Sequence, residues 1–239
     1  LFTNGGYRIY APVPLDGAAG PARAGTFLTN ADYLDFYVSA DLIDFDDTVR
    51  QAFGIAARVN NPGLGTTEGY LFSWEPGSGS LPGTSNGDLD ISTLVGEAPT
   101  GQIETTNSNL HLTRGKSYRF VFMGKGFDFE GQVYELPDTT NPLIRLPGHD
   151  SAGLYTNGIV GLIAASQSSL EVPGDATFDN FVALSIEPRL TVGQSGNTVT
   201  VSWPVLTSYV LQSTPSLSSP VWTDITTGIT HTGSRNVYP

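Results

Sequence analysis

The sequence predicts an all-β protein, with a two-sheet antiparallel jelly-roll sandwich followed by a small C-terminal β-sandwich-like module. Three observations predict it. Apolar and polar residues alternate in many short runs, the 239 residues include 28 glycines and 16 prolines, and only 14% of them are charged. Alternation places apolar side chains on one face of a strand, while glycine and proline favour the tight turns between strands. Little helix is therefore expected.

The clearest strand pattern lies in residues 35–45, where Phe36, Val38 and Ala40 share one face. Residues 46–48 are typical of a turn, so we expect 51–59 to return antiparallel and to form a long hairpin with it. Short edge strands are expected at 89–91 and 93–95. Further strands are expected at 7–10, 69–74, 117–123, 132–136, 158–164 and 175–184.

The composition changes at Ile186-Glu-Pro-Arg, which predicts domains at 1–187 and 188–239. Strand patterns in the second domain place Trp203 and Trp222 in its core. This second domain has about half of the roughly 100 residues of a complete sandwich. We therefore expect either that the chain continues or that a partner completes the sheet through its open edges.

Charge and composition exclude several classes of partner. The formal charge of -12 repels phosphate backbones, and nucleic acid is not an expected partner. No run of about 20 apolar residues predicts a membrane span. Without cysteine, disulfides and thiolate metal sites are impossible. The acidic, lysine-poor, Thr/Ser/Gly-rich balance is typical of exported bacterial surface proteins and predicts a secreted or cell-surface location.

Three stretches carry a family resemblance. Residues 174–182 (Gly-Asp-Ala-Thr-Phe-Asp-Asn-Phe-Val), after the strand at Gly158-Ile-Val-Gly-Leu, resemble the closing strand of concanavalin A-like lectin and glucanase domains. The 35–47 segment is similar too, and 115–122 resembles a strand of laminin-G-like modules. The resemblance covers 1–187 and implies a jelly roll. In the tail, Val199-Thr-Val-Ser-Trp203 resembles an early strand of a fibronectin type III module.

The resemblance also implies a structural calcium site. Asp179 matches the aspartate that helps to bind calcium in the closing strand of laminarinase-type members, and Asp175, Asp16 and Asn4 are the expected additional ligands. Calcium needs several oxygen ligands, which carboxylates, carbonyls and waters can supply. The alternative is that Asp179 and the neighbouring Asn180 cap a turn or pair with the first strand.

The acidic cluster of Asp41, Asp44, Asp46 and Asp47 has three interpretations. It is a second calcium loop, a carboxylate pair for glycoside hydrolysis formed by Asp44 and Asp46, or the solvated end of a hairpin. The glutamate-x-aspartate-x-x-glutamate strand of laminarinase-type enzymes is missing, so glucanase chemistry is not expected. No catalytic residues are therefore predicted, and no histidine pair with the spacing of zinc ligands is present.

Sugar binding in lectin-like sandwiches uses exposed aromatic rings that stack on the apolar faces of sugars. The candidates are Tyr70, Trp74, Tyr134 and Tyr155. Tyr70, Phe72 and Trp74 alternate along one strand, however, and core positions are the alternative for them.

The predicted function is a non-catalytic secreted module that binds carbohydrate or mediates extracellular adhesion, stabilised by Ca²⁺, with a glycan or a matrix component as partner. One alternative is a cell-surface or filament protein that assembles through open β edges. Another is a glycoside hydrolase that uses the Asp41–Asp47 cluster.

Overall fold

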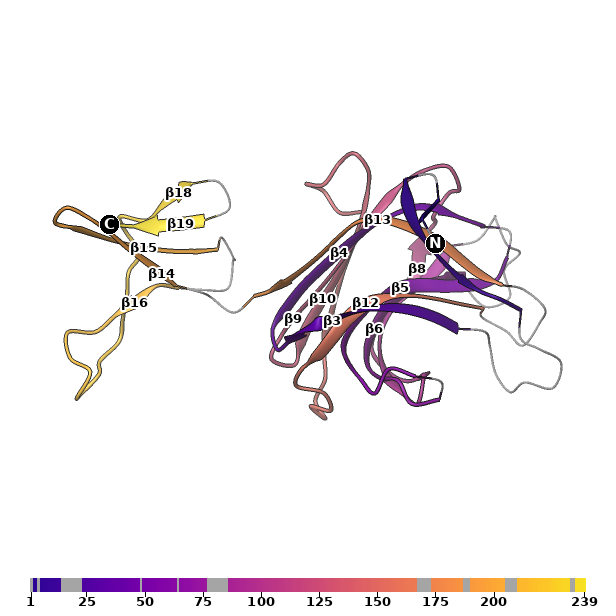
Figure 1. Ribbon diagram of the computed structural model, residues 1–239, viewed down its shortest axis with the longest axis horizontal. Coiled ribbons are helices and arrows are strands. Elements are labelled where there is room, and N and C mark those ends of the chain that lie inside the picture. The colour runs from indigo at the N-terminus through magenta and orange to yellow at the C-terminus, as the bar shows by residue number, and fades with distance from the viewer. Residues whose placement is uncertain are drawn as a thin grey trace. The chain divides into compact units, whose positions relative to one another are not determined.

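The computed structural model describes residues 2–3, 5–13, 23–47, 49–63, 65–76, 86–166, 173–186, 190–204, 210–232 and 235–239. The chain divides into two compact units, Leu1–Ser185 and Ile186–Pro239 (Figure 1). The described elements are strands, which confirms the all-β prediction. No helix in the described part of the chain is long and apolar enough to cross a membrane.

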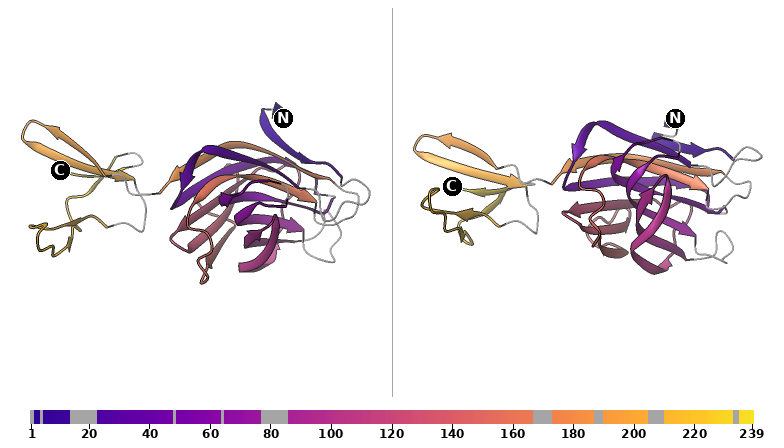
Figure 2. Two further views of the ribbon diagram at one scale, coloured as in Figure 1. Left: turned by 60° about the horizontal axis from the view of Figure 1, so that its bottom comes forward. Right: turned by 90° about the horizontal axis from the view of Figure 1, so that it is seen from below.

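Unit 1 is a sandwich of two antiparallel sheets, seen stacked in Figure 2. The seven-stranded sheet has the order β1 (Phe2–Thr3), β2 (Gly6–Ala11), β13 (Gly174–Ser185), β4 (Phe36–Phe45), β9 (Tyr118–Lys125), β10 (Asp128–Glu135) and β11 (Ile144–His149). The six-stranded sheet has the order β3 (Arg23–Tyr33), β12 (Gly158–Ser166), β5 (Gln51–Asn60), β6 (Glu68–Pro76), β7 (Gly87–Val95) and β8 (Ala98–Leu110).

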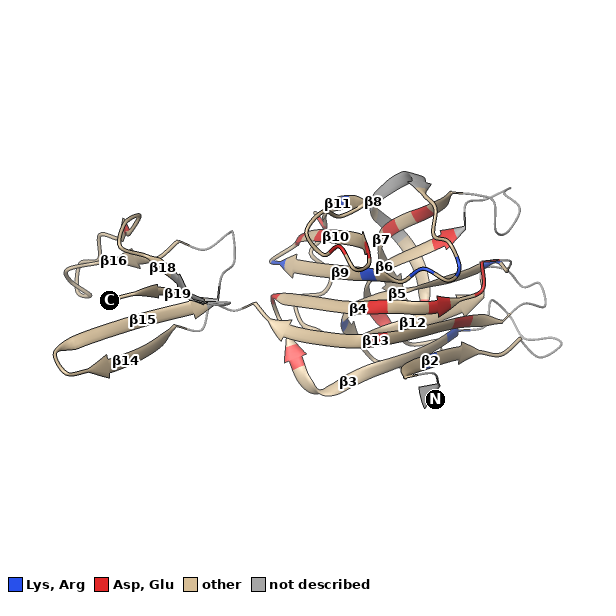
Figure 3. Ribbon diagram, turned by 90° about the horizontal axis from the view of Figure 1, so that it is seen from above, with Lys and Arg blue, Asp and Glu red and all other residues tan. Residues whose placement is uncertain are grey.

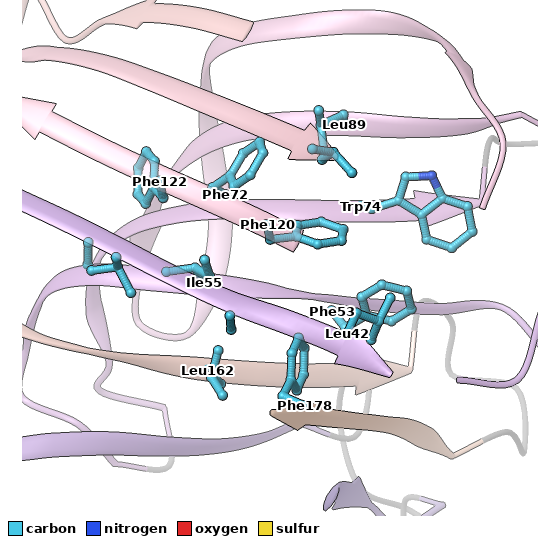
Figure 4. Close-up of a cluster of buried hydrophobic side chains, with 14 of the residues drawn as sticks. Leu42, Phe53, Ile55, Phe72, Trp74, Leu89, Phe120, Phe122, Leu162 and Phe178 are labelled. Carbon is cyan, nitrogen blue, oxygen red and sulfur yellow. The ribbon is translucent and has the colours of Figure 1, made fainter. Parts of the chain in front are cut away.

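The core lies between the two sheets and is rich in aromatic rings. Phe53 of β5 stacks on Trp74 of β6 with centroids 5.4 Å apart, and Phe72 of β6 stacks on Phe122 of β9 at 5.6 Å. Figure 4 shows these rings between the sheets. Each alternates with a residue on the outer face of its strand, as the period-two pattern requires. Burial of these large rings is the main stabilising contribution in a chain without disulfides.

The hairpin predicted for 35–59 is wrong. β4 pairs with β13 and β9, whereas β5 pairs with β12 and β6, so the two strands belong to different sheets. The connection therefore crosses from one sheet to the other, and Gln51 Nε2 donates to the carbonyl of Asp46 across it at 2.8 Å. The rings of Phe45 and Phe53, with centroids 5.4 Å apart and planes tilted by 55°, contact each other in the core because the strands pack across the sandwich. The two edge strands predicted within 89–95 are likewise one strand, β7, paired on both sides.

Arg58 is a fully buried cation at one end of this core. Between Ala57 and Asn60 the pairing of β5 with β6 shifts register by one residue, and this bulge turns Arg58 inward (φ 47°). Its Nε donates to the carbonyl of Leu34 at 2.8 Å and its Nη1 to that of Tyr155 at 3.1 Å. Burial lowers the pKa of Arg58. The guanidinium lies within 6.0 Å of the ring centroids of Phe36, Tyr70, Phe127 and Phe129.

Unit 2 contains a four-stranded sheet and a two-stranded one. Trp203 is buried there as predicted, but Trp222 is 54% exposed, so its assignment to the core is wrong. It precedes a strand of only two residues, which is too short to cover a ring of that size. The four-stranded sheet has the order β14 (Thr191–Ser195), β15 (Thr198–Pro204), β19 (Arg235–Tyr238) and β18 (Thr230–Thr232), and the other sheet pairs β16 (Gln212–Ser213) with β17 (Thr223–Asp224).

Replacing Arg58 by methionine is expected to lower the free energy of unfolding by about 3 kcal/mol, because the carbonyls of Leu34 and Tyr155 lose their donors. Arg58→Lys should also destabilise, since an ammonium cannot reproduce the planar fork of donors. Urea unfolding followed by tryptophan fluorescence measures both. The control is Arg145→Met, whose exposed ion pair with Glu130 should contribute less than about 0.5 kcal/mol. Equal losses at both positions would contradict the role of Arg58.

Candidate functional site

The candidate site is a groove of about 530 Å³ on the outer face of the six-stranded sheet. Its floor follows from the strand alternation: β5 turns Phe53 and Ile55 toward the core and small residues outward. One of them, Gly54, has no room for a side chain, because a Cβ there would lie 2.0 Å from the carbonyl oxygen of Phe72 on β6. Ala52, two residues before Gly54 on the same face of β5, lines the floor of the groove. Small residues on the central strand leave the face hollow.

Apolar walls and polar groups line this groove. The larger apolar positions come from five strands and the β5–β6 loop and are Phe27, Ile163, Leu71, Leu94, Pro99 and Pro62. The polar side chains are Arg23 of β3, Ser73 and Glu75 of β6, Ser166 of β12, Thr67 of the β5–β6 loop and Glu97 of the β7–β8 turn. Such a mixture of apolar surface with a few polar groups is typical of small-molecule sites.

An ion pair crosses the groove. The Nη1 of Arg23 lies 4.0 Å from Oε2 of Glu97, although β12, β5 and β6 separate β3 from β7 in the sheet. Because the inner face is the packed core, the two side chains can meet only over the outer face. Gly65 N also donates to Glu97 Oε2 at 2.7 Å, which fixes that carboxylate against the β5–β6 loop. The sheet is therefore concave toward the groove.

The β5–β6 loop forms one wall and is held by its own hydrogen bonds. Thr67 Oγ1 donates to the carbonyl of Gly63 at 3.0 Å, and Thr66 Oγ1 donates to that of Asn61 at 2.8 Å. The carbonyl of Thr67 also accepts from the N–H of Glu97 at 2.8 Å. These bonds organise the wall before a ligand arrives, which lowers the entropy lost on binding.

The aromatic residues predicted to bind sugar lie elsewhere. Tyr70 and Trp74 are buried in the core, which corrects their assignment to an exposed platform. Tyr134 is buried on the other sheet, where its hydroxyl donates to Gln132 Oε1. Tyr155 is half-buried, and its hydroxyl donates to the carbonyl of Leu94 at 3.0 Å. None of the four lines the groove.

Tyr70 has a structural partner in Asp150. Its hydroxyl donates to Asp150 Oδ2 at 2.6 Å and accepts from the N–H of Tyr155 at 3.2 Å. Burial, followed by the bond to Asp150, raises the pKa of Tyr70. Burial works to raise the pKa of Asp150 too, but hydrogen bonds from Tyr70 and the N–H groups of Leu154 and Ala152 outweigh it, and the net pKa is lowered.

The residues predicted to bind calcium are not gathered into a site in the described part of the chain. Asp175 forms a two-point ion pair with Arg8, with one contact of 2.7 Å. Asp179 is exposed, and its Oδ1 accepts from the N–H of Asn180 at 2.7 Å. Asp16 and Asn4 lie outside the described residues. The described residues contain no group of three or more acidic or histidine side chains that fits a metal, and calcium binding stays a prediction.

The acidic cluster of β4 is also dispersed. Asp41 is buried and held by Arg119 of β9, with contacts of 2.6 and 2.8 Å, and Figure 3 shows acidic positions on β4 beside a basic one on β9. Asp44 is exposed, while Asp47 accepts weakly from the N–H of Arg114 at 3.3 Å. Asp41 is thus a structural ion-pair partner and has no free carboxylate for acid–base chemistry.

No family model matches the chain, and no curated protein matches it in sequence. Among solved structures, the alginate lyase from Klebsiella pneumoniae is similar with a TM-score of 0.50 and 10% identity, covering 76% of this chain and 81% of that one. Unit 1 has the concanavalin A-like sandwich fold.

Other structures resemble the sandwich less closely. The carbohydrate binding module CBM66 from Bacillus subtilis has a TM-score of 0.48 and 17% identity, covering 70% of this chain and 84% of that one. The CG-16 agglutinin from chicken liver has a TM-score of 0.40 and 11% identity, covering 67% and 99%.

The Tyr70–Asp150 hydrogen bond predicts a pH-dependent loss of stability. Tyr70→Phe should lower the free energy of unfolding by about 1–3 kcal/mol at pH 7. The pKa of Asp150 is lower in the folded protein than its ordinary value of 3.8, so the ionised carboxylate stabilises the fold at pH values above 3.8. This stabilisation is lost as the pH falls through the pKa of the folded state. The difference between wild type and Tyr70→Phe should therefore shrink below about pH 4.

Urea unfolding between pH 7 and pH 3 measures this difference. Tyr155→Phe is the matched control, because its hydroxyl donates to a carbonyl that does not titrate, and its cost should stay constant with pH. A cost for Tyr70→Phe that is equally constant would contradict the assignment.

Proposed function

We propose that unit 1 binds an uncharged glycan in the outer-face groove, as a non-catalytic module of a secreted or cell-surface protein. The observation that carries the proposal is the pairing of Arg23 with Glu97 over an apolar floor. The structural similarities support the fold alone, so the assignment rests on the groove.

The chemistry of the groove matches that of a sugar ring. A pyranose has apolar C–H faces and a rim of hydroxyls, and Leu71 and Ile163 offer the apolar surface that such faces cover. Guanidinium and carboxylate groups each present two or more hydrogen-bonding atoms in one plane, which suits neighbouring hydroxyls. Arg23, Glu75 and Glu97 supply one donor fork and two acceptor pairs.

Charge favours an uncharged ligand. The groove contains two carboxylates and one guanidinium, and the whole chain has a formal charge of -12. An anionic sugar would therefore approach against the field of the protein, whereas a neutral one would not.

Glycan binding is expected to depend on the charged residues of the groove. On a mixed array of neutral and uronate-containing glycans, the protein should bind the neutral oligosaccharides. Measured by calorimetry, Arg23→Gln or Glu75→Gln should weaken this binding at least tenfold, which corresponds to about 1.4 kcal/mol. Glu130→Gln and Arg145→Gln, which break an exposed ion pair on the other sheet, are the matched controls. Absence of glycan binding, or equal losses in the controls, would refute the proposal.

Self-association of unit 2 is a second candidate function, with another copy of the chain as partner. Leu217 is 83% exposed and Val221 71%. In the described part of unit 2, the edge strand β14 pairs with β15 alone, is exposed throughout and contains neither charge nor proline. Such an edge is a template for strand addition. Because residues 186–239 contain two acidic and two basic residues, charge repulsion does not oppose the pairing of copies.

Sedimentation velocity over a concentration series tests this association. The full chain should form dimers or larger species, and Val192→Lys, which places a charge on the open edge, should return it to monomer. Ser218→Lys adds the same charge at an exposed position outside the sheets and should leave the distribution unchanged. A monomeric wild type at every concentration would exclude the self-association function.

A further inference from the structure

A second cavity, of about 320 Å³, opens at one edge of the sandwich. It lies where β2 and β13 of one sheet contact β3 and β12 of the other. Four of its ten lining residues are aromatic and two are leucines: Tyr7, Phe27, Phe178, Phe181, Leu28 and Leu162. We call this cavity the aromatic slot. Phe27 lines it together with the groove, and the other lining residues are different.

A β-bulge shapes the mouth of the aromatic slot. Asp179 pairs with Asp41, but the next pair is Val182 with Ser39, so β13 has one extra residue here. Asn180 adopts φ 49°, and its Nδ2 donates to Asp41 Oδ2 at 2.9 Å. The bulge is thereby anchored to an ion-paired carboxylate. Bulges re-aim side chains and are frequent beside functional sites.

The aromatic slot carries an uncompensated negative charge. Asp41 and Asp175, the neighbouring carboxylates of β4 and β13, are each paired with an arginine. Asp179 lines the slot, is exposed, and forms an ion pair with no Lys, Arg or His in the part of the chain that the structure describes. A cation bound in the slot would meet this carboxylate and the aromatic rings together.

We propose that the aromatic slot binds an organic cation of the quaternary ammonium class, with Asp179 as its counter-ion. Ring faces attract such cations by a cation–π interaction. A methylated ammonium needs no hydrogen-bond acceptors, and its methyl groups suit apolar walls. Calcium instead requires six to eight oxygen ligands. The oxygen-bearing side chains of the slot are those of Asp179, Asn180, Thr26 and Tyr7, and only the first is a carboxylate, whereas the other walls are aromatic or leucine side chains. The slot therefore fits an organic cation better than the metal predicted at Asp179.

Choline and its uncharged isostere 3,3-dimethylbutan-1-ol, titrated into the full chain by calorimetry, test the cation requirement. Choline should bind at least tenfold more tightly than the isostere. Asp179→Asn and Phe181→Leu should each weaken choline binding at least fivefold, because the first removes the charge and the second removes a ring while keeping apolar volume. Phe181 is 36% exposed, so its replacement should leave the fold intact, and tryptophan fluorescence checks this.

Two control variants test whether choline binds in the aromatic slot and not elsewhere on the protein. Asp44→Asn removes an exposed carboxylate of β4 outside the slot and should leave choline binding unchanged. Arg23→Gln should weaken glycan binding in the groove at least tenfold without affecting choline binding, so failure of either site is distinguished from failure of the other.

Three results would overturn the proposal. Equal affinity for choline and the isostere would make the slot simply apolar, and absence of choline binding would remove the ligand class. Stabilisation by CaCl₂ that EGTA reverses and Asp179→Asn abolishes, with choline inactive, would assign Asp179 to calcium.

Discussion

The aromatic layer between the two sheets is the constraint on which the rest of the structure depends. Phe53 contacts Trp74 on its own sheet and Phe120 and Phe178 on the other, with centroids 5.4 to 6.5 Å apart. Without disulfides, such contacts contribute most to the relative position of the sheets. Both cavities depend on that position, since the groove needs the curvature of one sheet and the aromatic slot needs the separation of the two.

Arg58 closes one end of this layer, at a buried position that core packing usually gives to an apolar residue. Its guanidinium lies over four rings and donates to two carbonyls from different loops, so a single side chain fixes β5, the β3–β4 turn and the segment before β12. A buried charge is expensive unless its donors are satisfied and its surroundings are polarisable. The two carbonyls satisfy Nε and Nη1, and the rings surround the guanidinium. Nη2 has no hydrogen-bond partner among the described residues, but it lies 3.7 Å from Asp35 Oδ1, whose charge partly compensates it.

Much of the fold was predictable, because alternation determines which residues of a strand face inward. The patterns at 36–42 and 69–74 placed Phe36, Val38 and Phe72 correctly in the core. Alternation does not determine which strand lies next to which, however. The 46–48 turn residues suit a hairpin and a crossing between sheets equally well, and only the strand pairings, with Phe45 packed on Phe53 across the core, distinguish them. Aromatic type makes Tyr70 and Trp74 candidates for sugar binding, yet their positions on the Phe72 face of the strand favour burial.

The groove was harder to predict, because its key pair is distant in sequence and lies on no motif. Arg23 belongs to an edge strand with a weak alternation pattern, and Glu97 belongs to a turn. The available sign is the small residue Ala52 of β5, which lies next to the large core residue Phe53, faces outward and lines the groove. Edge strand β3 then has two roles. Arg23 and Phe27 line the groove, while Thr26 and Leu28 line the slot. Because an edge strand is bounded by a neighbour on one side only, both of its faces can border cavities, and this places two distinct chemistries at one margin of the sandwich.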